Sequence, residues 1–240
     1  MTGTFEGLLT IVFDCYVNKQ FPTSIQCNNI YQTNMLNSLV KIETDTEKSD
    51  RIKNGIIKNI SYDVFFNSYV AFLSNSNTKE LSIVKYLCHS FVSGPSVHNM
   101  LSIPYVFEVH DTRKRVLLES HRLKGLLRFI SITDNLFYSI IHPDNDIIEF
   151  LGTHFTKRLS NINFIIIDKV RNKSFVYDTK KYQIMDVTNL EIPQVSEEET
   201  EFQNMWKAFF KTIAIKERTN PKLQATYMPR RYWKDLIEID

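Results

Sequence analysis

Glycine and cysteine are scarce in this 240-residue chain. It contains six glycines and three cysteines, whereas glycine makes up about 7% of an average protein. The shortage of glycine argues against glycine-rich nucleotide-binding loops and against an all-β fold with many tight turns. The cysteines, Cys15, Cys27 and Cys88, are widely spaced and form no CxxC pair. That spacing argues against a disulfide framework, a four-cysteine zinc site and a self-contained iron–sulfur cluster.

Long apolar runs are also missing. No stretch of about 18 residues is apolar throughout, and a membrane-spanning helix needs roughly that length. The apolar stretch that begins the chain has no basic residues before it, unlike a secretory signal. We therefore expect no membrane span and a cytoplasmic location.

The common catalytic and cofactor-binding motifs do not occur. We find no GxxxxGK[ST], GxGxxG, GxSxG or HExxH motif, no zinc-deaminase signature and no CxxxCxxC arrangement. We therefore predict no cofactor and no metal site. The remaining candidates for acid–base catalysis are His121 and His154. His154 follows Leu151 on an apolar helical pattern, where a structural histidine is the more common interpretation.

The positive charge of the chain is concentrated in two segments. Residues Lys207–Lys234 hold eight basic residues and one acidic residue, and Arg113–Arg128 hold six and one. The rest of the chain carries a net charge of −10. Such segregation is typical of a protein that binds a polyanion. On charge alone, two solvated helix faces explain the pattern equally well.

These two basic segments supply the candidate nucleic-acid contacts. The first runs from a helix end into a strand, in which Arg128 faces away from Leu127 and Phe129, and it could form a phosphate-binding corner. The second interleaves basic and aromatic residues, which can pair with phosphates and stack on bases. The alternatives are helix-dipole complementation plus a salt bridge to Glu119 for the first segment and a C-terminal strap packed on the core for the second. The candidate contacts are Arg122, Lys124, Arg128, Lys222, Arg230, Arg231, Tyr232, Trp233 and Lys234.

Hydrophobic periodicity predicts helices before Gly125 and strands after it. Thr4 is a candidate N-cap, and either Asp45 or Thr46 can cap the next helix. Gly125 is expected at positive φ, closing a helix. Five short strands are predicted over 126–132, 136–141, 164–170, 174–178 and 182–187, with one helix inserted after Pro143. Ser196 begins a closing helix with a stripe that we expect to be buried, consisting of Phe202, Met205, Trp206, Phe209 and Ile213.

The predicted fold class is therefore α+β. N-terminal helices precede a central antiparallel sheet of about five short strands, which contains one inserted helix, and a C-terminal helix closes the fold. We interpret residues 1–240 as a single domain. The best candidate for a subdomain boundary is Gly94–Pro95.

Several blocks of the chain resemble a known family, named "probable DNA metabolism protein". The blocks are ESHRLKGLLRF at 119–129, HPD at 142–144 and MPRRYWK at 228–234. Leu126 departs from the family pattern, which has phenylalanine there. The resemblance implies a bacterial protein of DNA metabolism or repair that partners a radical-SAM DNA modification or repair protein. In some bacteria a related domain is fused to a uracil-DNA-glycosylase-like domain.

Three functions follow from this sequence. The first is a non-catalytic DNA-repair accessory that binds nucleic acid through the two basic segments and partners a radical-SAM protein. The second is an enzyme acting on DNA or a nucleotide, with His121 and His154 as acid–base groups and Arg122, Lys124 and Arg128 holding a phosphate. The third is a protein-interaction module whose basic face meets an acidic partner.

Overall fold

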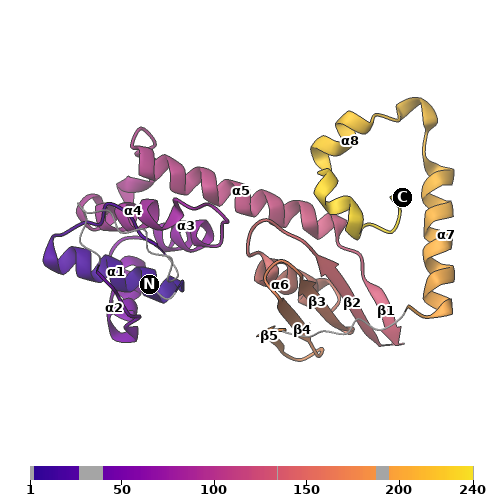
Figure 1. Ribbon diagram of the computed structural model, residues 1–240, viewed down its shortest axis with the longest axis horizontal. Helices are drawn as coiled ribbons and strands as arrows, with labels where there is room; N and C mark the ends of the chain where they lie inside the picture. Colours follow the sequence, from indigo (N-terminus) through magenta and orange to yellow (C-terminus); the bar gives the residue numbers. More distant parts are fainter. Residues whose placement is uncertain (1–2, 27–39, 134, 188–194, 240) are drawn as a thin grey trace. The chain divides into compact units, whose positions relative to one another are not determined.

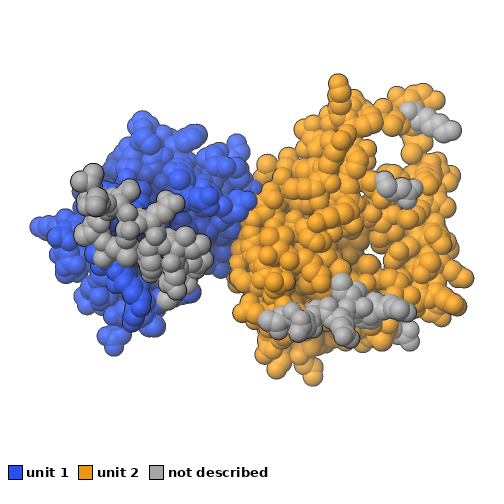
Figure 2. Space-filling model, viewed as in Figure 1, with its two compact units in different colours: residues 1–117 blue, residues 118–240 orange. Residues whose placement is uncertain are grey.

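A computed structural model describes residues 3–26, 40–133, 135–187 and 195–239 of the chain. They form two compact units, Met1–Leu117 and Leu118–Asp240 (Figure 2). The boundary between the two units falls within the long helix α5 (Pro104–Leu126). The single domain over residues 1–240, with a candidate subdomain boundary at Gly94–Pro95, stays a prediction.

The first unit is helical. The Thr4 hydroxyl accepts a hydrogen bond from the Gly7 N–H at 3.1 Å, and the Asp45 carboxylate accepts one from the Lys48 N–H at 3.1 Å. Thr4 and Asp45 are therefore confirmed as N-caps. Its helices are α1 (Phe5–Asn18), α2 (Thr46–Asn59), α3 (Tyr62–Phe72), α4 (Lys79–Ser93), the 3₁₀ helix η1 (Gly94–Asn99) and α5 up to Leu117 (Figure 1). One apolar core joins them, with side chains such as Leu8, Ile56 and Leu87 fully buried.

The second unit is built on a five-stranded sheet in the order β1-β2-β3-β4-β5. Its strands are β1 (Ile130–Thr133), β2 (Leu136–Ile141), β3 (Asn163–Asp168), β4 (Lys173–Tyr177) and β5 (Tyr182–Asp186). The α+β class, the five strands and the inserted helix are confirmed. The antiparallel prediction is wrong for one pair, because β2 and β3 run parallel. The inserted helix causes this, since it returns the chain to the edge where β2 began.

The inserted helix α6 (Ile148–Arg158) packs against β3 and β4. Gly152 allows the close approach, since a Cβ at this position would lie 2.2 Å from Cδ2 of Phe175. The rings of Phe129 and Phe155 meet at 5.1 Å between centroids, and those of Phe164 and Phe175 stack at 6.1 Å. This aromatic layer forms the core of the second unit.

The C-terminal segment follows the sheet as α7 (Glu197–Ile213), η2 (Lys216–Arg218), α8 (Pro221–Tyr227) and η3 (Arg230–Asp235) (Figure 1). The predicted start of α7 is confirmed, because Ser196 accepts the Glu199 N–H at 3.1 Å. The predicted burial of its apolar stripe is wrong. Phe202, Met205, Phe209 and Ile213 are all more than half exposed, and Trp206 is 37% exposed.

Gly125 also differs from expectation. It lies inside α5 and not at a left-handed helix end, because the helix continues to Leu126. Gly94, where α4 ends, has a positive φ of 62°, as does Gly3 at 71°. No helix in the described parts of the chain combines the length and apolar character needed to cross a bilayer.

Candidate functional site

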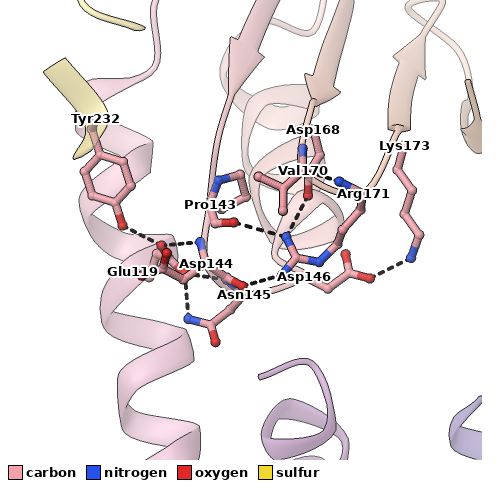
Figure 3. A network of polar contacts seen from close by, with 10 residues as sticks. All are labelled: Glu119, Pro143, Asp144, Asn145, Asp146, Asp168, Val170, Arg171, Lys173 and Tyr232. Carbon is pink, nitrogen blue, oxygen red and sulfur yellow. Dashed lines mark hydrogen bonds and ion pairs between the residues drawn. The ribbon is translucent and has the colours of Figure 1, made fainter. Parts of the chain in front are cut away.

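Glu119 lies at the centre of a polar network in the second unit (Figure 3). Its side chain is 3% exposed. The carboxylate accepts the backbone N–H groups of Asp144 and Asn145, both at 2.9 Å, and the Asn145 side-chain amide at 2.6 Å. It also accepts a hydrogen bond from the Tyr232 hydroxyl group. A buried carboxylate with four donors is well compensated, so Glu119 fixes the loop after β2 to the helix α5.

This loop lies where β2 and β3 end. Because the two strands are parallel, His142 after β2 and Asp168 at the end of β3 lie at the same edge of the sheet. Arg171 donates to the carbonyl oxygen of Pro143 at 3.2 Å and to Asp168 at 3.1 Å (Figure 3). Burial raises the pKa of Asp168, and the Arg171 charge opposes that shift. Arg171 therefore holds the loop from the side opposite Glu119.

The C-terminal block 228–234 packs against this network. Tyr232 is 1% exposed, and burial raises the pKa of its phenol, so the hydroxyl stays protonated and donates to Glu119. Arg231 lies 3.0 Å from Asp144 and 3.6 Å from Glu119. The Trp233 indole donates to the carbonyl oxygen of Met228 at 2.8 Å. Much of this block is therefore structural, as the alternative of a C-terminal strap predicts.

The last residues make two further links to the sheet. His142 Nδ1 lies 2.9 Å from Asp235, and burial raises the pKa of that carboxyl while the histidine opposes the shift. Arg128 pairs with Glu238 through both its Nε and Nη2 atoms. Burial acts to raise the pKa of Glu238, but the hydrogen bonds that its carboxylate accepts and the Arg128 charge together outweigh burial, and the pKa is lowered. The guanidinium of Arg128 is thus already neutralised within the unit.

The structure brings the two predicted basic segments together in the second unit. Arg122 on α5 donates to the carbonyl oxygen of Thr226 on α8 at 3.3 Å, across 104 positions of sequence. Of the candidate contacts, Arg128 and Arg231 lie in ion pairs and Tyr232 is buried. Arg122 and Lys124 are half-buried. The remaining basic candidates, Lys222, Arg230 and Lys234, are exposed. Of these, Arg230 stacks over the Trp233 ring at 5.6 Å from its centroid.

A further group of cations lies at the ends of α5 and α6. The charges of Lys124, Lys157 and Arg158 act on His154, and we call these four residues the α5–α6 basic cluster. Burial lowers the pKa of His154, and the three positive charges lower it further. Lys157 and Arg158 are exposed and complement the carboxyl end of the α6 dipole. Three cations around a neutral imidazole can bind an anionic group such as a phosphate.

The predicted acid–base pair is placed as follows. His121 is exposed on α5, and His154 is half-buried on α6 within the α5–α6 basic cluster. His142 pairs with Asp235, which is not a member of that cluster. Among the described residues, no group of three or more His, Cys, Asp or Glu side chains is arranged to hold a metal ion.

Sequence reasoning missed two features. The sequence suggested only a salt bridge for Glu119. That it is the one acidic residue within a basic segment was the signal that could have indicated a structural role. Lys157 and Arg158 were not candidate contacts, because only the folded chain places the last turn of α6 beside Lys124.

Comparison with known proteins identifies the family of this chain. A family model described as a domain of unknown function matches residues 77–238, which covers the sheet, the Glu119 network and the C-terminal block. The chain belongs to that family, DUF4130. No curated protein and no solved structure matches the chain significantly.

Proposed function

We propose that this protein binds nucleic acid through a basic surface of its second unit and serves as an accessory of DNA metabolism or repair. The observation that carries the proposal is the α5–α6 basic cluster. Burial and the positive charges of Lys124, Arg158 and Lys157 all lower the pKa of His154, so these cations act on the same site. Cations that gather on one surface are the electrostatic signature of a phosphate-binding protein.

The link between the two basic segments supports the same proposal. Arg122 contacts α8, and the Glu119–Tyr232 bond holds η3 against α5. Exposed Lys222, Arg230 and Lys234 therefore belong to the same unit as Lys124. A rigid arrangement of cations lowers the conformational entropy that is lost on binding a nucleic-acid backbone.

The biological setting rests on the resemblance in the sequence. The blocks at 119–129, 142–144 and 228–234 resemble the "probable DNA metabolism protein" family. We therefore propose a radical-SAM DNA modification or repair protein as the partner, and the cytoplasm as the location. Co-purification with that radical-SAM protein, followed by DNA-binding assays on each protein alone and together, tests this part of the proposal.

Salt-dependent DNA binding tests the surface itself. Fluorescence anisotropy with labelled single-stranded and double-stranded oligonucleotides gives the slope of log K against log salt. We expect Lys157→Ala with Arg158→Ala to reduce that slope by about two units, because each lost phosphate contact removes about one. The sequence of the oligonucleotide should matter little, since phosphate contacts carry no sequence information.

The matched control is Lys180→Ala with Lys181→Ala. These two exposed residues lie in the β4–β5 turn of the same unit, and the variant loses the same charge. Its slope should match that of the parent. An equal reduction in both variants would show that net charge alone governs binding, and an unchanged slope in the Lys157/Arg158 variant would refute the proposed surface.

A further inference from the structure

Glu199 and Trp206 join helix α7 to the rest of the second unit. The Glu199 carboxylate accepts the backbone N–H of Ser131 at 3.2 Å, and Gln203 donates to Glu199 at 3.0 Å. The indole of Trp206 donates to Glu238 at 3.3 Å. Trp206 lies at the border between this attached side and the open side of α7, because its ring is hydrogen-bonded to Glu238 and is still 37% exposed.

The open side of α7 is strongly apolar. Phe202, Met205, Phe209 and Ile213 are 60%, 63%, 53% and 58% exposed, and Trp206 and Phe210 are both 37% exposed. Phe202, Trp206, Phe209 and Ile213 follow one another at spacings of four, three and four residues. That spacing is the seam of a two-helix coiled coil.

The exposed apolar area on α7 is large. Side chains of this size carry about 150–250 Å² each, so the six exposed fractions amount to roughly 600 Å² per molecule. A stable dimer of standard size buries about 800 Å² per partner. The six exposed apolar side chains of α7 thus approach the area that a second chain would need to cover.

The charges of α7 indicate which occupant fits. Its first turn carries Glu197, Glu198 and Glu199, whereas its last turn carries Lys211. Two copies of the helix placed antiparallel would bring the acidic end of one beside the basic end of the other. Their helix dipoles would also oppose each other favourably. In a dimer with such a two-fold axis, every contact between the two helices occurs twice.

We propose that two copies of this protein pair through α7, with the two helices antiparallel and the Phe202, Trp206, Phe209 and Ile213 seams in contact. The two-fold axis passes between Trp206 and Phe209, near the middle of the seam. Phe202 of one copy then lies beside Ile213 of the other. The proposal does not depend on nucleic-acid binding, because no residue of the α5–α6 basic cluster takes part.

Sedimentation equilibrium tests the pairing. The full chain should sediment at twice 28.2 kDa at about 100 μM, with dissociation near the micromolar range for an interface of this size. Phe202→Glu with Phe209→Glu should give the monomer, since four charges would meet in an apolar seam. A parent that is monomeric at this concentration overturns the proposal.

A matched variant controls for added charge. Asn204→Glu with Ala208→Glu places two glutamates on exposed positions of α7 outside the seam, and this variant should remain dimeric. Circular dichroism establishes that both variants keep the helix content of the parent. If the Phe202/Phe209 variant still dimerises, the copies pair through another surface and the proposal is wrong.

Disulfide trapping tests the antiparallel orientation without disrupting the fold. Chains carrying Phe202→Cys and Ile213→Cys, distinguished by tags of different size, should form a mixed disulfide when combined and oxidised. Each alone should form no more cross-linked dimer than the parent. Cross-linking of either variant with itself would indicate parallel helices and would overturn the proposal.

Discussion

Glu119 and Tyr232 lie 113 positions apart in the sequence, yet the Tyr232 hydroxyl donates a hydrogen bond to the Glu119 carboxylate. Both side chains are almost completely buried. This bond joins α5 to the C-terminal block, and the same carboxylate holds the loop after β2. The arrangement of the second unit therefore depends on one acidic residue.

Tyr232→Phe is expected to lower the free energy of unfolding by about 1–2 kcal/mol, because Glu119 loses one of its donors in a buried site. Urea denaturation followed by circular dichroism measures the change. Tyr227→Phe is the control, since Tyr227 is 71% exposed and its substitution should change stability by less than about 0.5 kcal/mol. Equal effects of the two variants would show that the buried bond adds little.

Local signals in the sequence predicted much of this fold. The caps Thr4, Asp45 and Ser196 are confirmed because capping depends on residues within one turn. The five strands and the inserted helix are also confirmed, since their periodicity lies within each segment. The parallel pairing of β2 with β3 was missed because it depends on how the chain returns after α6.

Non-local relationships explain the other differences. The stripe on α7 was expected to be buried, but an amphipathic pattern shows only that a helix face needs a partner. It does not show that the partner belongs to the same fold. Likewise, the basic residues were evident, but the pairing of Arg128 with Glu238 and of Arg231 with Asp144 could not be predicted from sequence.

Gly152→Ala should destabilise the protein by about 1–3 kcal/mol, because a methyl group would overlap the Phe175 ring and force the core apart. The nearest ring atom would lie only 2.2 Å away. This cost exceeds the gain of roughly 0.5–1 kcal/mol that alanine brings to a helix interior. A rise in the melting temperature would contradict the close packing of α6 on β4.

Gly125→Ala should have the opposite effect. Gly125 lies within α5, and a Cβ there would meet no atom within 4 Å. Alanine should therefore stabilise the protein by roughly 0.5–1 kcal/mol. Thermal denaturation of the parent and the variant measures this gain, and a clear loss of stability would indicate a left-handed conformation at this position.

The Arg128–Glu238 pair predicts a dependence of stability on pH. The pKa of Glu238 is lowered from its ordinary value of 4.5, so the unfolded state takes up the proton first as the pH falls. The stabilisation is then present above about pH 4.5 and is lost as the pH falls through the lower folded-state pKa. Glu238→Gln removes this titration.

Urea denaturation of both proteins measures the difference in unfolding free energy at each pH. The parent should be more stable than Glu238→Gln at pH 7, and the difference should shrink towards about pH 3. A difference that stays constant over this range would show that the carboxylate charge contributes nothing.

Trp233 distinguishes a structural role of the C-terminal block from a base-stacking role. Its indole N–H donates to Met228 at 2.8 Å, and Arg230 stacks on its ring. We expect Trp233→Ala to lower the free energy of unfolding by about 1–3 kcal/mol, because it removes packing and the hydrogen bond. The salt slope of DNA binding should stay as in the parent, since no cation is lost.

The variant Trp233→Phe separates the two roles of that residue. Phenylalanine keeps an aromatic face for stacking but cannot donate to Met228, so a structural role predicts that some stability is still lost. If the indole instead stacks on a base, Trp233→Ala weakens single-stranded binding by about 1–3 kcal/mol and Trp233→Phe restores most of it. Melting temperatures and anisotropy titrations on the same samples decide between these outcomes, because the first follows packing within the unit and the second follows contact with the nucleic acid.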